Sequence, residues 1–260
     1  IIGVRMVADE DWDKGLSKEE GLKIVKKIIK SEKVDFLNII RGHIDTDASL
    51  TKVIPTQGMK SSPHLDFAGD IKFESSFPIF HASKINDVAT ARYAIQEGKL
   101  DMVGMTRAHI ADPYIVKKII NGRENTIRPC VGATYCLDRI YEGNEALCIH
   151  NPATGREKFI PHEISTKADQ KKKIAIVGAG PSGLEAAKVC SERGHEVIVF
   201  EASNIAGGQL NLITRSERRK DMLGIIDWRI EACKENNVTF HYNTFATKDI
   251  ILKESPNYVI

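Results

Sequence analysis

The fold of this chain is decided by one stretch, Lys173-Ile174-Ala175-Ile176-Val177-Gly178-Ala179-Gly180-Pro181-Ser182-Gly183. The apolar first half of this stretch predicts a β-strand, which runs into a Gly-x-Gly-x-x-Gly turn. The residues that follow predict a helix over 184–193 and a second strand over 197–201. A strand, a glycine turn, a helix and a strand in this order are typical of a unit that binds a dinucleotide.

The residues of the turn would each meet a different need. Gly178 permits the tight turn, Gly180 lets the backbone approach a pyrophosphate, and Gly183 lets the helix pack closely on the strand. The pyrophosphate would lie at the helix N-terminus, beside Pro181 and Ser182, where unpaired N–H groups and the helix dipole favour an anion. The alternative is a glycine-rich turn that holds no ligand.

Two features further along the chain support nucleotide binding. Glu201 ends the second strand 18 residues after Gly183, where a carboxylate can accept a hydrogen bond from a ribose hydroxyl. Gly207, Gly208 and Gln209 follow after a short loop, and a double glycine there would let the backbone approach a second part of the dinucleotide. Alone this is only a turn, but beside the first glycine turn it favours FAD over NAD.

The composition excludes several classes of partner. The chain has 260 residues, which is enough for one or two domains, and a net charge of only +2. No basic surface indicates nucleic acid, and no apolar stretch approaches the ~20 residues that span a bilayer. Five cysteines without a disulfide pattern or a signal peptide indicate a cytoplasmic protein.

Both ends of the sequence look like the interior of a larger protein. The chain starts at Ile1 on a strand-like segment, and residues 257–260 read as the beginning of another strand. We therefore expect the chain to be a fragment.

Residues 1–122 alternate between strand and helix patterns. Strands are expected at 1–7, 34–40, 77–82 and 100–105, and helices at 18–30, 87–97 and 113–121. Ser17 and Glu20 form a capping box for the first helix. This alternation predicts a parallel sheet, which could be an open sheet or half of an eight-stranded barrel. The stretch 41–75 is too long for an ordinary connection, so we expect it to carry function or to pack as an excursion.

Several charged residues occur at the expected ends of these strands. Ser83 and Lys84 follow the third strand and Arg107 the fourth, so they could bind a phosphate if the strands belong to a barrel, and would otherwise be ordinary loop residues. His43 follows the second strand and could act as a general base, although most such residues are solvated. Arg5 lies in an apolar strand, and on residue pattern alone a salt bridge is favoured.

Residues 123–172 contain Cys130, Cys136 and Cys148 within 19 residues, followed by a polar linker. Thiolates at such spacings suit zinc or an iron–sulfur cluster, with His150 or water as a further ligand, and three structural thiols remain the alternative. Residues 173–260 hold the nucleotide-binding unit, where a long helix is expected over 217–236 and a strand over 238–242.

Taken together, these segments resemble the flavin oxidoreductases related to old yellow enzyme. The similar subgroup is the multidomain one of trimethylamine, dimethylamine and histamine dehydrogenases and 2,4-dienoyl-CoA reductase. The motifs that carry the resemblance occur in the family's order: Gly3-Val4-Arg5, 78–87, Val103-Gly104-Met105-Thr106-Arg107, Ala111-Asp112-Pro113, Arg128-Pro129-Cys130, Cys136-Leu137-Asp138-Arg139, Cys148-Ile149-His150-Asn151-Pro152 and the glycine turn. The segment 151–157 also resembles the N-methylproline demethylase branch.

The resemblance implies the C-terminal half of an FMN-binding TIM barrel at 1–122, an iron–sulfur segment at 123–172 and a partial Rossmann-like FAD/NAD(P)-binding domain at 173–260. Arg5 would then face the flavin N1/O2 edge instead of forming a salt bridge. Lys84 and Arg107 would bind the FMN phosphate, and the three cysteines of 123–172 would hold a 4Fe-4S or 3Fe-4S cluster. The glycine turn, Glu201 and the double glycine would bind FAD or ADP.

Two positions depart from the family pattern. The family has a fourth cysteine three residues after the first, and this chain has Ala133 there. A cluster with another ligand, a three-iron cluster and a lost cluster all stay open. The phosphate loop of the family has Gly-Arg where this chain has Ser83-Lys84, so the charge is kept but the bidentate guanidinium is lost.

The resemblance implies oxidative N-demethylation of a small methylated amine, with hydride passing to FMN and single electrons to the cluster. The first alternative is the reverse flow, in which NAD(P)H drives reduction of an enoyl thioester. A non-catalytic nucleotide-binding module that has lost its cluster is the alternative of a different class. Expected partners are a small-molecule substrate and an electron-transfer protein, and the full-length protein could be an oligomer.

Overall fold

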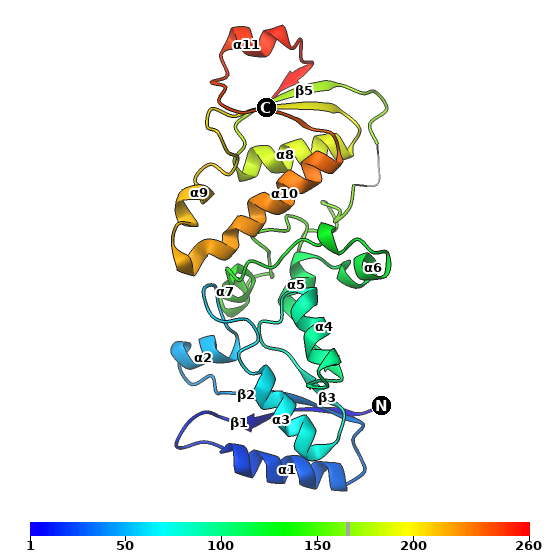
Figure 1. Cartoon of the computed structure of the whole chain (residues 1–260), viewed down its shortest axis with the longest axis vertical. Helices are drawn as coiled ribbons and strands as arrows, with labels where there is room; N and C mark the ends of the chain where they lie inside the picture. Colours follow the sequence, from blue (N-terminus) through cyan, green and yellow to red (C-terminus); the bar gives the residue numbers. More distant parts are fainter. Residues whose placement is uncertain (165–166) are drawn as a thin grey trace. The chain divides into compact units, whose positions relative to one another are not determined.

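The computed structural model describes residues 1–164 and 167–260, which form two compact units, Ile1–Pro113 and Tyr114–Ile260. Each unit contains one parallel sheet (Figure 1). None of the described helices has the length and apolar character that crossing a membrane requires. The division at residues 122 and 172 stays a prediction, and residues 165–166 of the expected linker lie outside the described residues.

The N-terminal unit has four parallel strands in the order β1-β2-β3-β4. The strands are β1 (Gly3–Asp9), β2 (Phe36–Arg41), β3 (Ile79–His81) and β4 (Met102–Val103). The helices of this unit are α1 (Lys18–Lys30), α2 (Asp47–Val53), α3 (Leu65–Ser75), α4 (Val88–Gln96) and α5 (Thr106–Ala111). The predicted α/β class with a parallel sheet is confirmed, and the half-barrel stays a prediction.

The two faces of this sheet differ in character. One face packs against helices and forms the core, which includes Val25, Leu37, Ile39, Ile71 and Ile79. The strand register aligns the other face in a row across all four strands: Arg5, Asn38, Phe80 and Met102. This row lies opposite the helices because successive side chains of a strand alternate between the faces.

The stretch 41–75 contains two helices that the sequence pattern did not predict. The Thr46 side chain caps α2 by accepting from the Ser49 N–H at 3.2 Å. Helix α3 buries Leu65, Ala68 and Ile71 in the core. The expected excursion is therefore a pair of short helices joined by a loop at 54–64.

The C-terminal unit has the strand order β7-β6-β5-β8, all parallel. Its strands are β5 (Lys173–Val177), β6 (Glu196–Phe200), β7 (Thr239–His241) and β8 (Tyr258–Val259). Its helices are α6 (Ile115–Ile120), η1 (Glu124–Thr126), α7 (Tyr135–Tyr141), α8 (Pro181–Glu192), α9 (Leu210–Ile213), η2 (Glu217–Leu223), α10 (Gly224–Glu235) and α11 (Lys248–Lys253). Counted along this sheet, the order is 3-2-1-4, as in a Rossmann-like fold.

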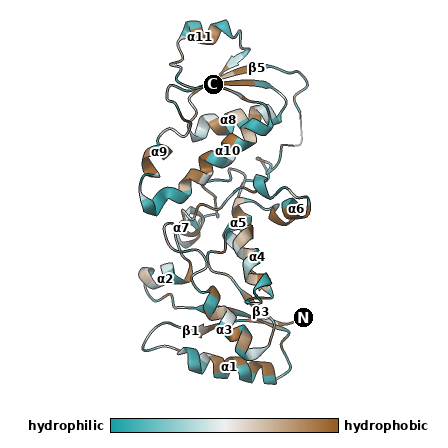
Figure 2. Ribbon diagram, in the orientation of Figure 1, coloured by the Kyte–Doolittle hydropathy of each residue, from teal (hydrophilic) through white to brown (hydrophobic). Residues whose placement is uncertain are grey.

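Apolar residues cover both faces of this second sheet. One face packs with α8 and α10 around Ile176, Leu184, Val199 and Ile226. On the other face, Phe200 lies in a smaller cluster that α11 covers. Figure 2 shows hydrophobic residues along β5, and mixed hydrophobic and hydrophilic residues on α8 and α10. Helices on both faces are the arrangement that buries a parallel sheet.

Two element boundaries differ from the sequence prediction. Helix α8 begins at Pro181, three residues before the expected start, because proline is well suited to the first helical position and Gly180 is the N-cap. The expected helix over 217–236 begins as a 3₁₀ segment and becomes α-helical at Gly224. The strand expected at 257–260 is confirmed as β8.

Candidate cofactor-binding sites

The glycine turn after β5 has the geometry that its spacing predicts. Gly178 has φ +100°, a conformation that favours glycine. A Cβ on Gly183 would lie 2.0 Å from the Gly178 carbonyl oxygen, so the helix approaches the turn too closely for any side chain. A Cβ on Gly180 would meet no atom within 4 Å. Gly180 is therefore not needed for packing within the chain, and the space beside it suits a ligand.

The N-terminus of α8 offers donors to that space. Gly180 is the N-cap and has no side chain to accept from the first-turn N–H groups, including those of Ser182 and Gly183. The double glycine lies against this turn, because the Gly207 N–H donates to the Ala179 carbonyl at 2.8 Å. The structure thus brings both glycine motifs together at one end of the sheet, where a pyrophosphate fits.

Glu201 follows β6 directly and contacts the same turn. One carboxylate oxygen accepts from the Ala179 N–H at 2.7 Å, and the other accepts from the Ser203 N–H at 2.8 Å. Burial raises the pKa of Glu201, but the hydrogen bonds from Ser203 and Ala179 outweigh it and lower the pKa overall. The carboxylate is therefore ionised at neutral pH and can accept from a ribose hydroxyl.

In the N-terminal unit, Lys84 and Arg107 both contact the loop at 54–64. The Lys84 Nζ donates to the Met59 carbonyl, and an Arg107 N–H donates to the Pro55 carbonyl at 2.8 Å. Ser83, between β3 and Lys84, has a buried hydroxyl without a hydrogen-bond partner among the described residues. The structure thus brings both cations to one loop, where they bind backbone carbonyls, and the phosphate site stays a prediction.

The backbone at Lys84 is strained and is held by the same loop. Lys84 has φ +48°, which is uncommon for a residue with a side chain. Its carbonyl accepts from the Ser61 hydroxyl at 3.0 Å and from the Ser62 N–H at 3.2 Å. Strained residues of this kind cluster at functional sites. Ser61 and Ser62 therefore hold the backbone of Lys84, and sequence reasoning missed them because serines in a loop carry no positional signal.

The two other residues predicted for this unit, Arg5 and His43, have different contacts. Arg5 is exposed and forms no ion pair with the described residues, so the first interpretation as a salt bridge is wrong. Its strand partner is Asn38, which offers no charge. His43 stacks on Trp12 with ring centroids 4.7 Å apart, and its Nδ1 accepts from the Asp45 N–H at 3.3 Å.

The cysteine segment lies in the C-terminal unit, with Cys130, Cys136 and Cys148 half-buried and not in disulfides. Within the described residues, no three His, Cys, Asp or Glu side chains converge on one metal ion. An iron–sulfur cluster does not require such convergence, because its cysteines bind different iron atoms. The Cys148 sulfur accepts from the His150 N–H at 3.4 Å, as cluster sulfurs do. The cluster therefore stays a prediction, and with Ala133 the set is one cysteine short of the family's four.

His150 does not join the cysteines as a ligand group in the described part of the chain. Its Nδ1 lies 2.9 Å from the Pro129 carbonyl and donates to it, and its ring packs edge-on against Trp228 at 5.4 Å. Burial and the Arg229 charge lower the pKa of His150 well below the ordinary value, so the imidazole is neutral. Cys233 is fully buried and burial raises its pKa to about 12, so it is a core thiol.

Both units have matches among known protein families. Residues 1–126 match the NADH:flavin oxidoreductase / NADH oxidase family, and residues 176–230 match the NAD(P)-binding Rossmann-like domain. A probable N-methylproline demethylase of Rhizobium meliloti (strain 1021) is 61% identical over 260 residues, which cover 100% of this chain and 38% of that protein. An N,N-dimethylglycine/sarcosine dehydrogenase of Chromohalobacter salexigens is 38% identical, with coverage of 100% and 38%.

A solved structure shows the same arrangement of elements. The complex of 2-naphthoyl-CoA reductase with 2-naphthoyl-CoA matches 98% of this chain with a TM-score of 0.89 and 29% identity, and the match covers 38% of that chain. This chain therefore spans about 38% of the length of these relatives.

The matches define a class, the flavin oxidoreductases that carry a further nucleotide-binding unit. Within this class, the chain belongs to the NADH:flavin oxidoreductase / NADH oxidase family related to old yellow enzyme, in the multidomain subgroup of trimethylamine dehydrogenase. The resemblance noted from the sequence motifs is confirmed.

Proposed function

We propose that this chain is part of a longer flavin- and iron–sulfur-dependent oxidoreductase that demethylates a small N-methylated amine. One observation carries the proposal: 61% identity, maintained over all 260 residues, to the probable N-methylproline demethylase. The dehydrogenase of N,N-dimethylglycine and sarcosine, 38% identical, acts on N-methylated amino acids too. An N-methylated amino acid is therefore the favoured substrate class.

The N-terminal unit would hold FMN as the final half of a TIM barrel. Ser83, Lys84 and Arg107 would bind its phosphate, supported by the buried Ser83 hydroxyl and by the contacts of both cations with the loop at 54–64. Arg5 would place its exposed guanidinium against the flavin edge, where it stabilises negative charge. His43 would be the candidate general base.

The C-terminal unit would hold a second nucleotide, FAD or ADP. Gly178, Gly180 and Gly183 would form the pyrophosphate turn with Pro181 and Ser182, and Glu201 would accept from the ribose. Gly207, Gly208 and Gln209 would line the same nucleotide, with NAD(P)H as a further candidate. Cys130, Cys136 and Cys148 would hold the cluster. When bound, a flavin accepts a hydride and a cluster passes single electrons.

Product analysis tests the demethylation. The full-length protein, supplied with N-methylproline and an artificial electron acceptor, should release formaldehyde and proline in equal amounts. Two-electron oxidation of the N-methyl group gives an iminium ion, which water hydrolyses to these products. Reduced acceptor without formaldehyde would contradict demethylation.

Replacing Lys84 by Met should lower the FMN content of the purified protein, whereas the exposed Lys60 replaced by Met should leave it unchanged.

The second candidate is an NAD(P)H-dependent reductase of an unsaturated CoA thioester. The observation in its favour is the match to the 2-naphthoyl-CoA reductase complex with a TM-score of 0.89. In that case NAD(P)H would reduce the flavin and a thioester would consume the electrons. For the first candidate, demethylation, we also propose an electron-transfer protein as the acceptor. The full-length protein would be cytoplasmic and could be an oligomer.

A further inference from the structure

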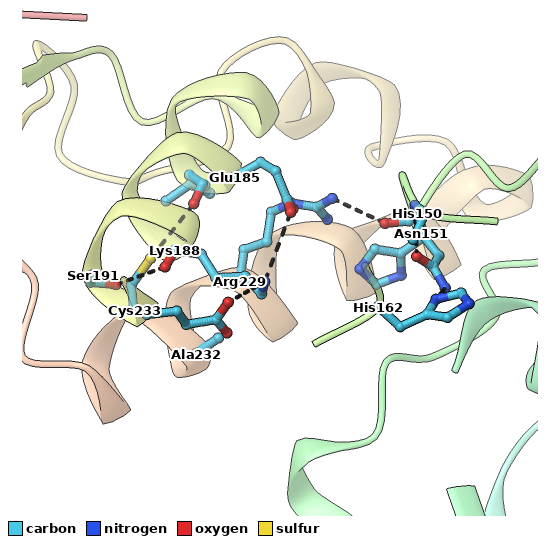
Figure 3. A network of polar contacts seen from close by, with 12 residues as sticks. His150, Asn151, His162, Glu185, Lys188, Ser191, Arg229, Ala232 and Cys233 are labelled. Carbon is cyan, nitrogen blue, oxygen red and sulfur yellow. Dashed lines mark hydrogen bonds and ion pairs between the residues drawn. The ribbon is translucent and has the colours of Figure 1, made fainter. Parts of the chain in front are cut away.

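A buried arginine joins the cysteine segment to two helices of the nucleotide-binding unit. Arg229 on α10 has only 5% of its surface exposed. Its Nε lies 2.8 Å from the Glu185 carboxylate on α8, one Nη donates to the Ile225 carbonyl at 3.0 Å, and the other donates to the His150 carbonyl at 3.1 Å (Figure 3). Each nitrogen of the guanidinium thus has a partner, and one of them binds the backbone carbonyl two residues after Cys148.

His150 carries this connection to both ends of the cysteine segment. Its N–H donates to the Cys148 sulfur, and its Nδ1 donates to the carbonyl of Pro129, the residue before Cys130. Only 1% of His150 is exposed, so these contacts are shielded from water. Fixing the His150 carbonyl therefore fixes the spacing between the chain at Cys130 and the chain at Cys148.

The guanidinium of Arg229 reaches the Cys148 end of the segment through one residue, because it binds the His150 carbonyl and the His150 N–H donates to the Cys148 sulfur. Burial lowers the pKa of Arg229, while the Glu185 carboxylate raises it. Lys188 lies 2.9 Å from Glu192, and the Arg128 guanidinium, a second cation beside the cysteine segment, lies over the Trp228 ring at 4.3 Å. Arg229 is the cation of α10 that binds the backbone of the cysteine segment directly.

We propose that Arg229 is a positioning residue for the cysteine segment, which fixes the His150 backbone and stabilises the added electron of the cluster through its positive charge. The inference rests on the iron–sulfur cluster of the proposed function. A positive charge favours the form of a redox group that carries one more electron, so Arg229 raises the reduction potential. Glu185, its partner carboxylate, acts in the opposite direction.

The potential of the cluster, followed by EPR in the full-length protein during an anaerobic redox titration, tests the proposal. Replacing Arg229 by Met should lower the ratio of reduced to oxidised cluster at fixed potential about tenfold, which is about 59 mV for one electron. Replacing Glu185 by Gln should raise the same ratio. Arg229→Lys, which keeps the charge and loses the fork, should stay closer to the original protein than Arg229→Met.

A matched control lies on the same helix. Lys234 is exposed on α10 and pairs with Glu231 at 2.7 Å, so Lys234→Met removes one positive charge away from the cysteines and should leave the ratio unchanged. Shifts of opposite sign in Arg229→Met and Glu185→Gln cannot come from general loosening of the fold. If Arg229→Met fails to fold, Arg229→Gln takes its place, because the amide can still donate to a carbonyl while the positive charge is lost.

The outcomes separate this inference from the proposed function. An original protein without iron and labile sulfide would overturn both the cluster and the role of Arg229. A protein with a full cluster whose potential is unmoved in Arg229→Met, or in Arg229→Gln where only that variant folds, would overturn the role of Arg229 only. The iron content and the EPR spectrum report this without any assay of turnover.

Discussion

At the scale of single residues, two glycines of the turn after β5 differ in the space that the fold leaves for a side chain. A Cβ at Gly183 would overlap the Gly178 carbonyl oxygen at 2.0 Å, whereas a Cβ at Gly180 would meet nothing within 4 Å. Gly183→Ala should therefore destabilise the protein by about 1–3 kcal/mol. Gly180→Ala should change stability by less than about 1 kcal/mol and still reduce bound FAD or ADP, because the methyl group occupies the approach of the pyrophosphate.

Thermal unfolding and the nucleotide content of the purified variants check this pair. A Gly180→Ala protein that unfolds like the original and keeps its full nucleotide would contradict the placement of the pyrophosphate. Equal losses of stability in both variants would contradict the steric distinction between the two glycines.

Glu201 makes the stability of the folded protein depend on pH. Its pKa lies below the ordinary value of 4.5 in the folded protein, so its contribution to stability is complete above about pH 4.5 and is lost as the pH falls through the folded pKa. Glu201→Gln turns an N–H group toward one of the two donors, Ala179 or Ser203. We expect a loss of about 1–3 kcal/mol at pH 7 that shrinks toward pH 3. Urea unfolding at both pH values measures it, and a loss that grows on acidification would contradict the assignment.

At the scale of the elements, N-caps show which helices hold the N-terminal unit together. Ser17 caps α1 in a capping box, and α1 buries Val25 in the core. Thr46 caps α2, which buries no residue. Ser17→Ala should cost about 1 kcal/mol of stability. Thr46→Ala, the same change of cap, should cost less because α2 can fray without exposing the core, and the two melting temperatures compare them directly.

The elements also show where sequence patterns suffice. Helix α1 matches its predicted range because its cap, its amphipathic stripe and its C-terminal end agree. The pattern placed the start of α8 at Leu184, since Pro181 and Gly183 look unsuited to a helix, whereas Pro181 at the first position and the close contact at Gly183 are what this helix requires. Local helix propensity gives the wrong helix boundary where packing against a strand, or binding of a ligand, determines which residue is required.

At the scale of the whole molecule, the class and order of the units followed from the motifs, but the partners of the side chains did not. The salt bridge first favoured for Arg5 assumed a buried strand centre, and the structure exposes the Arg5 side chain. The contacts of Lys84 and Arg107 with the loop at 54–64 join residues up to 52 positions apart, a separation on which periodicity carries no information. The sequence analysis also missed Arg229. A charged residue in a helix is expected to be exposed, and only the structure shows that Arg229 is buried with three partners.

The most direct test of oxidative demethylation is the colour of the flavin. The full-length protein, oxidised and anaerobic, is mixed separately with N-methylproline and with NAD(P)H while the flavin absorbance near its visible maximum is followed. The account predicts bleaching by the N-methylated amine alone, before any electron acceptor is added. Bleaching by NAD(P)H with no response to N-methylated amines would contradict it and would establish the reductase direction.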